Sequence, residues 1–267
     1  MFKEFFLLFL LGHVLGDFYF QTKKMADKKE KSFKWVFIHC LCYWAAMTIV
    51  VLPVISYELI MATAAASLLH FVIDIAKYIF YSVCEKKGKR TLVLERNLFF
   101  ADQMIHLLCL VIISYELVIN QILMIEFDLI KDIFATVGIL EIRMLTWIIS
   151  LLIIHKPANI MIQKLLLIYK PEDKENDNKK DNQNESKNES KNDSKKDNNA
   201  GRFIGTVERI VMLIFLAIGQ YSAIGLVLTA KSIARYDRIS KEKDFAEYYL
   251  LGTLISTVLV IVVSFII

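Results

Sequence analysis

The sequence predicts an all-α, polytopic membrane protein with an N-terminal bundle of four to five helices, a C-terminal hairpin and a final membrane helix. Of its 267 residues, 56% are hydrophobic, and the mean hydropathy is +0.47. A soluble domain has about 45–50% apolar residues. Several apolar runs also approach the ~20 residues that cross a bilayer. Only nine Gly and three Pro are available to interrupt them.

The first four helices follow from these apolar runs. We expect one over about 4–20, uncleaved because no small-residue cleavage site follows its apolar run. A basic loop, "QTKKMADKKEKSFK", leads to a helix over about 34–54 that ends near Pro53. The next helix, about 57–82, contains "ATAAAS", whose small residues predict a packing face. A fourth helix is expected over about 97–119.

The amino-acid composition of the chain changes twice in its second half. After a weakly polar stretch with the amphipathic piece "DLIKDIFATVGIL", a fifth helix is expected over about 144–156, ending before Pro157, with an amphipathic tail to Tyr169. Residues 172–200 contain no large apolar residue, so burial cannot offset the entropy of ordering them. We therefore predict a membrane bundle over 1–170, a disordered linker over 171–200 and a C-terminal membrane module over 201–267.

Lys and Arg predict the orientation, because they favour cytoplasmic loops. They are concentrated in the loops 21–34 and 85–97 and absent from 53–58. We expect a multi-pass protein of the bacterial inner membrane, with its N-terminus outside and its linker cytoplasmic. The net charge of +4 is small, and the basic residues report topology and indicate no nucleic-acid partner.

The segment 206–235 conflicts with a simple crossing. A straight span would place Lys231 and Arg235 outside, against the same rule. Gly219 and Gly225 bracket "QYSAI", which favours a re-entrant hairpin, with a single crossing as the alternative. A last helix is expected over about 245–267. Glu208, Lys231 and Arg235 are candidates for mutual pairing or for anionic lipid head groups, and positive-inside anchoring is the simpler interpretation.

Three apolar helices carry a His and an Asp four residues apart. The pairs are His13 with Asp17, His70 with Asp74, and Asp102 with His106, and a single His39 lies on the remaining helix. Residues four apart share a helix face. With the predicted topology, all seven groups lie at a similar depth near the cytoplasmic face. Ionisable groups inside a membrane are costly and mark functional sites.

Such a layer predicts a site for a divalent metal, since imidazole and carboxylate ligands suit zinc, manganese or iron. The candidate ligands are His13, Asp17, His39, His70, Asp74, Asp102 and His106. Gln21 and Gln103 are expected to support the ligands or contact a substrate. A structural polar network and a proton path remain alternatives. Cys40 and Cys42 in "HCLC" are a weak metal signal, because small apolar filler explains them better.

At these residues the sequence resembles a bacterial membrane family catalogued as domain of unknown function 3307. The resemblance is carried by "GHVLGDFYFQTKKMADKK", "HFVIDIAKY" and "ADQMIHLL", and covers roughly residues 5–125. The C-terminal segment looks like an extension that many members carry. The resemblance implies that His13, Asp17, Gln21, His70, Asp74, Asp102, Gln103 and His106 matter. It implies no activity, and His39 is the position to which the family resemblance extends least firmly.

The leading functional prediction is a membrane-embedded, metal-dependent hydrolase whose substrate is a lipid or other amphiphile near the cytoplasmic leaflet. Asp17 or Asp102 would act as general base on metal-bound water. One alternative is a non-enzymatic transporter or proton-relay protein. Another is a membrane scaffold whose linker recruits partners.

Overall fold

The computed structural model describes residues 1–54, 56–123, 136, 141–169 and 187–267, and every structural statement here refers to these ranges. Regular structure in them is entirely helical. The chain divides into two compact units, Met1–Leu152 and Ile153–Ile267, and the division falls inside a helix. Five helices are long and apolar enough to cross a membrane, so the chain is a multi-pass membrane protein.

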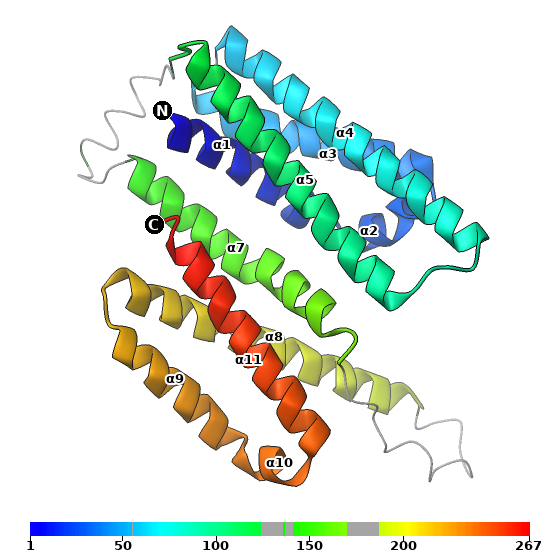
Figure 1. Cartoon of the computed structure of the whole chain (residues 1–267), viewed down its shortest axis with the longest axis vertical. Helices are drawn as coiled ribbons and strands as arrows, with labels where there is room; N and C mark the ends of the chain where they lie inside the picture. The colour runs from blue at the N-terminus through cyan, green and yellow to red at the C-terminus, as the bar shows by residue number, and fades with distance from the viewer. Residues whose placement is uncertain (55, 124–135, 137–140, 170–186) are drawn as a thin grey trace. The chain divides into compact units, whose positions relative to one another are not determined.

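The first unit is a bundle of antiparallel helices (Figure 1). Its elements are α1 (Phe2–Val14), a π-helix (Leu15–Tyr19), α2 (Lys23–Lys29), α3 (Phe33–Val51), a short 3₁₀ turn (Leu52–Val54), α4 (Tyr57–Lys86), α5 (Leu92–Ile119) and the first part of α7 (Glu141–Leu166). Tyr19 Oη donates a hydrogen bond to the carbonyl of Leu152 at 3.0 Å, which joins the π-helix to α7. The four predicted helices before residue 120 are therefore present.

The core of this unit forms where α1 crosses α3. Phe5 and Phe9 of α1 and Met47 of α3 are fully buried. The backbones approach closely because α1 and the π-helix carry glycines on the facing side. A Cβ on Gly16 would lie 2.7 Å from Cδ2 of Tyr43, and one on Gly12 would overlap the Met47 sulfur. These contacts bring the π-helix against α3.

The small-residue run in α4 packs as predicted. Ala62, Thr63, Ala66 and Ser67 are buried, whereas the intervening Ala64 and Ala65 are exposed. This alternation is the 3.6-residue period of a helix that presents one face to its neighbours. The run therefore allows close packing on that side, as small residues do in lipid.

The basic segment after the first helix is not the predicted loop. Residues Lys23–Lys29 form α2, bent by 88° from the preceding helix. Thr22 caps α2, because its Oγ1 accepts a hydrogen bond from the backbone N–H of Met25 at 3.2 Å. The Met25 side chain is buried and holds α2 against the bundle. The Thr22 cap and the buried Met25 side chain thus stabilise a helix that the high Lys content of the segment made hard to predict.

Two helix boundaries also differ from expectation. α5 begins at Leu92, five residues earlier than predicted, because Thr91 Oγ1 caps the N–H of Leu94. α7 continues through Pro157 to Leu166, so the predicted end at residue 156 is wrong. Pro157 cannot donate to the carbonyl four residues before it. Arg209 donates to the adjacent carbonyl of Ile154 at 3.2 Å, which stabilises the backbone there.

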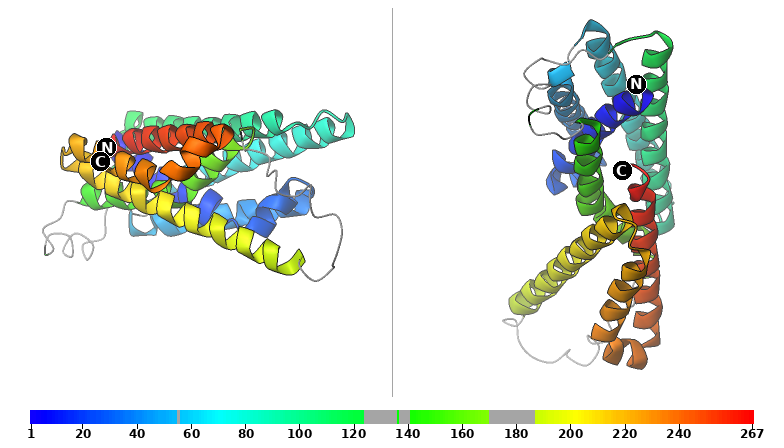
Figure 2. Two further views of the ribbon diagram at one scale, coloured as in Figure 1. Left: turned by 90° about the horizontal axis from the view of Figure 1, so that it is seen from below. Right: turned by 90° about the vertical axis from the view of Figure 1, so that its left-hand side faces the viewer.

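The second unit contains the rest of α7, α8 (Lys187–Ala217), α9 (Tyr221–Ala234), α10 (Tyr236–Lys241) and α11 (Lys243–Ser264). The chain reverses between α8 and α9, where Gly219 has a φ of 73°, and α10 leads into α11, which packs against α8 and runs in the same direction as α8 (Figures 1 and 2). The chain reversal of the predicted hairpin and the last helix are present, although Gly225 lies inside α9, and the re-entrant path through the membrane stays a prediction. With 14 residues, α9 is about 21 Å long, short of the ~30 Å hydrocarbon core.

Two predictions fall wholly or partly outside the described residues. The amphipathic piece around 128–140 is one, apart from Thr136. The linker predicted over 171–200 is the other. Its residues 171–186 are not described, and its residues 187–200 belong to the first half of α8. Its disorder stays a prediction.

Candidate metal centre

Four elements bring the seven predicted His and Asp side chains into one buried layer. The π-helix and the end of α1 supply Asp17 and His13, α3 supplies His39, α4 supplies His70 and Asp74, and α5 supplies Asp102 and His106. Each of the seven is at most 6% exposed. The antiparallel arrangement explains the convergence, because it sets the start of α3 and α5 beside the later part of α1 and α4.

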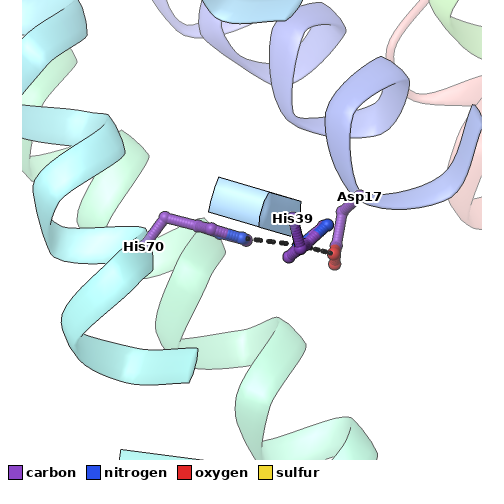
Figure 3. A group of neighbouring side chains, drawn as sticks. All are labelled: Asp17, His39 and His70. Atoms are coloured by element: carbon purple, nitrogen blue, oxygen red, sulfur yellow. Dashed lines mark hydrogen bonds and ion pairs between the residues drawn. The ribbon is translucent and has the colours of Figure 1, made fainter. Parts of the chain in front are cut away.

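The closest approach is centred on His39 Nε2 (Figure 3). This atom lies 3.2 Å from Asp17 Oδ1, 3.2 Å from His70 Nε2 and 3.4 Å from Asp74 Oδ2. His70 Nε2 lies 3.6 Å from the same Asp74 oxygen. Two imidazoles and two carboxylates from three segments therefore point at one position, although they are far apart in the sequence.

A second group adjoins the first through Asp74. Donor atoms of Asp74, Asp102 and His106 all lie within 4.8 Å of one another. The rings of His70 and His106 are 4.3 Å apart, so the two groups are in contact. Cys40 also has its Sγ within 4.8 Å of donor atoms of His70 and Asp74, which gives this thiol a place beside the layer.

Gln103 and His13 connect the layer without facing its centre. Gln103 Nε2 donates to Asp17 Oδ2 at 2.8 Å, and its Oε1 lies 3.4 Å from His13 Nε2. Because an amide oxygen only accepts, His13 donates from Nε2 and accepts from the Tyr43 hydroxyl at Nδ1, 3.3 Å away. Both ring nitrogens are thus engaged, and His13 holds Gln103, which in turn orients Asp17.

Two lysines that the sequence analysis did not include take part in the layer. Lys29 Nζ of α2 lies 3.3 Å from Asp74 Oδ2 and 3.7 Å from Asp17 Oδ1, and Lys77 Nζ lies 2.7 Å from Asp102 Oδ2. Two ammonium groups face three carboxylates, so one negative charge remains when the imidazoles are neutral. Met25 and Lys29 are four residues apart and share one face of α2. This spacing was the feature of the sequence that could have indicated that Lys29 faces the bundle.

Arg90 fixes the position of α2 and hence of Lys29. In the connection between α4 and α5, Arg90 donates to Glu30 at 2.6 Å and to Glu95 at 2.7 Å. The hydrogen bond to Glu95 raises the pKa of the Arg90 guanidinium further above its usual range. This cation therefore does not titrate, and it links the end of α2 to α5 at any physiological pH.

Several buried polar atoms of the layer have no hydrogen-bond partner within the described residues. They are Asp17 Oδ1, Gln21 Oε1, His39 Nδ1, His70 Nδ1, Asp74 Oδ1, Asp102 Oδ1 and both ring nitrogens of His106. Buried polar groups are normally paired, so such a concentration indicates a site for an additional ligand. Unlike Gln103, Gln21 has a side-chain oxygen, Oε1, that makes no hydrogen bond within the described residues.

The second unit holds the remaining predicted residues. Lys231 Nζ lies 2.7 Å from Glu208 Oε2, so these two pair, whereas Arg235 is exposed and outside that pair. Arg209 is 2% exposed and donates to neutral acceptors, among them Asn159 Oδ1 at 2.7 Å. Because most of those acceptors lie on other helices, the sequence could not indicate that Arg209 joins the helices of this unit.

A family model described as "Protein of unknown function (DUF3307)" matches residues 5–133. The resemblance carried by the three His/Asp segments is thus confirmed, and the match contains all seven His and Asp residues of the layer. No curated protein and no solved structure matches the chain.

Proposed function

We propose that the region matching this family binds a divalent metal ion through Asp17, His39, His70 and Asp74, and acts as a membrane-embedded hydrolase of a lipid or other amphiphile. The observation that supports this most is the environment of His39 Nε2, which has three potential acceptors within 3.4 Å. A single N–H can serve only one of them well.

A metal cation would satisfy all of these atoms together. Imidazole nitrogen and carboxylate oxygen are ligands that zinc, manganese and iron share. The excess negative charge of the layer also favours a cation. Asp74 belongs to both groups of donors, so a second ion at Asp74, Asp102 and His106 would share this carboxylate with the first. Two-metal hydrolases use such bridged arrangements.

The chemistry proposed is hydrolysis by an activated water. A bound divalent metal lowers the pKa of its water to ~7, which makes hydroxide available at neutral pH. Asp102 suits the role of proton acceptor: its Oδ2 is held by Lys77, whereas its Oδ1 accepts no hydrogen bond within the described residues. Asp17 is then a ligand, oriented by Gln103.

Elemental analysis of the detergent-purified protein tests metal binding. We expect one or two equivalents of zinc, manganese or iron in the wild-type protein and less than a tenth of that in a His39→Gln, Asp74→Asn variant. The matched control is His155→Gln, since His155 is the one histidine outside the layer. A wild-type protein that stays metal-free after incubation with each ion, yet remains folded, contradicts the proposal.

A separate measurement tests hydrolysis. The metal-loaded protein is incubated with a membrane lipid extract, and products are followed by mass spectrometry. Asp102→Asn should lower turnover by about 10²–10⁴-fold, as loss of a general base does, while the ion at Asp17, His39, His70 and Asp74 stays bound. Turnover that survives both this variant and a chelator would argue against a metal-dependent hydrolase.

A proton path is the second candidate, and the two lysines favour it. Lys29 and Lys77 already neutralise carboxylates of the layer, as in a network of ion pairs that passes protons. Reconstituted in liposomes, such a protein would show pH-dependent flux that Asp102→Asn abolishes. Flux without bound metal would favour this candidate over the hydrolase.

A further inference from the structure

A second site lies in the unit Ile153–Ile267 and does not depend on the proposed metal centre. Residues from α8, α9, α10 and α11 line an open cavity of about 740 Å³. Much of its wall is apolar, and Phe245, Tyr248 and Tyr249 contribute three aromatic rings. A cavity of this size is in the range that holds a small organic ligand.

The charged groups around the cavity are mostly cationic. Lys231, Arg235 and Arg238 line it, against Glu208 and Asp237. Lys231 is neutralised by Glu208, and Arg238 pairs with Glu242 at 3.1 Å while lying 4.1 Å from the Phe245 ring centroid. Arg235 makes no ion pair within the described residues, so its charge is available to an anionic ligand.

Two hydroxyl groups of the lining lie close to one another and make no well-aligned hydrogen bond. Tyr249 Oη and Thr253 Oγ1 are buried, and none of their contacts within the described part of the chain has good hydrogen-bond geometry. They lie four residues apart on α11 and thus share a face. A ligand that brings acceptor oxygens into the cavity would satisfy both.

The place of the cavity along α11 indicates which anion it takes. α11 is a candidate membrane span, and the lining residues Phe245–Thr253 belong to the half of it that begins at Lys243. Lys and Arg gather at this end of the hairpin, and tyrosines favour the interface between bilayer and water. We therefore expect the cavity to lie at the level of lipid head groups.

We propose that this cavity binds the phosphate of an anionic phospholipid. Arg235 would contact the phosphate, the hydroxyls of Tyr249 and Thr253 would donate to its oxygens, and the apolar wall would receive the start of the acyl chains. Exposed Ile204, also in the lining, offers an apolar surface to those chains. The charge of Arg235, the two hydroxyl donors and the expected depth support the same occupant.

Titration of the full-length protein in detergent with phosphatidylglycerol and phosphatidylcholine, followed by native mass spectrometry, tests the proposal. Phosphatidylglycerol should bind at least tenfold more tightly. Arg235→Gln should weaken it about fivefold, the usual effect of one basic residue at a membrane surface. Tyr249→Phe should weaken it by a similar factor. The control Lys243→Gln removes an exposed charge that does not line the cavity and should have no effect.

Three results would overturn the proposal. One is equal binding of the two lipids. Another is equal weakening by Arg235→Gln and Lys243→Gln, which would indicate general surface charge. The third is displacement of the lipid by millimolar inorganic phosphate, which would indicate a site for the free anion. Both exposed residues can be replaced without unfolding the protein, and a thermal melt verifies this.

Discussion

Lys29 is the residue that bears most directly on the metal proposal. Its ammonium group contacts the same two carboxylate oxygens that the metal would use, Asp74 Oδ2 and Asp17 Oδ1. It is only 12% exposed, so solvent screens these contacts weakly. The ammonium therefore competes with a metal for the two carboxylates.

Replacing Lys29 tests whether a metal ion uses these two carboxylate oxygens. Lys29→Met should raise metal affinity at least tenfold, because removing a charge a few ångström from the ligands is worth more than about 1.4 kcal/mol at low effective dielectric. Competition with a chromophoric chelator measures the affinity, and Lys24→Met, exposed on the same helix, is the control. An unchanged affinity together with a lower melting temperature would instead show that Lys29 is structural.

Gly16 acts through close packing. A Cβ there would lie 2.7 Å from Tyr43 Cδ2 and 3.2 Å from the Tyr43 Cα, which is backbone and cannot yield easily. Gly16→Ala should destabilise the protein by about 1–3 kcal/mol, as overpacking does. Bound metal should fall too, since Tyr43 stacks on His70 with ring centroids 3.7 Å apart.

Thermal unfolding and metal content measure these two effects of Gly16→Ala. Gly201→Ala is the control, because a Cβ there meets no atom within 4 Å. An unchanged melting temperature in the Gly16 variant would mean that α3 can move away from the π-helix at no cost.

At the scale of elements, the π-helix Leu15–Tyr19 carries Asp17. His13 and Asp17 are four residues apart and were predicted to face the same neighbour. In the structure both contact Gln103 of α5, and both contact α3, His13 through Tyr43 and Asp17 through His39. The wider turn of a π-helix shifts the residues that follow, and such turns are frequent at functional sites.

An ion pair between Glu208 and Lys231 joins α8 and α9 in the hairpin. Glu208 and Lys231 are 15% and 23% exposed. Lys231→Met should destabilise the protein by about 1–3 kcal/mol, because it leaves a partly buried carboxylate unpaired. The double variant with Glu208→Gln should recover most of that loss. The exposed pair Lys243 and Glu247 is the control and should contribute less than about 1 kcal/mol. Additive effects at Glu208 and Lys231 would contradict the pairing.

The same hairpin predicts the membrane side of α10. If α8 and α9 are re-entrant, Ser240→Cys is modified by an impermeant maleimide from the cytoplasmic side only. Tyr57→Cys, in the lysine-free connection, should react from the opposite side. Both are made in a protein without its four native cysteines. Labelling of Ser240→Cys together with Tyr57→Cys would show that the segment crosses the membrane instead.

At the scale of the whole molecule, the two units divide the proposed activities. The proposed metal ligands all lie between residues 17 and 106, inside the first unit, and the proposed lipid cavity lies between 201 and 253, inside the second. A chain ending at residue 169 should therefore retain its metal and lose selective binding of anionic lipid. Elemental analysis and native mass spectrometry check this. Loss of metal on truncation would show that the first unit needs the second.

Much of this architecture could be predicted because a bilayer constrains it strongly. Long apolar runs must be helices in lipid, so the spans, the packing face in "ATAAAS" and the direction of each helix follow from hydropathy and charge. The convergence of His13, Asp17, His39, His70, Asp74, Asp102 and His106 follows from the same directions. Hydropathy and charge are local properties, so the sequence alone determined these features.

Only the tertiary structure decided which atoms meet. Lys29 enters the layer because α2 bends back by 88°, and Lys77 pairs with Asp102 because α4 packs against α5. Gln103, not Asp17, contacts His13, and Arg209 finds its acceptors on other helices. Such pairings depend on how far each helix turns and how closely its small residues let a neighbour approach. Those rotations and distances arise from packing between segments distant in the chain, which no local pattern encodes.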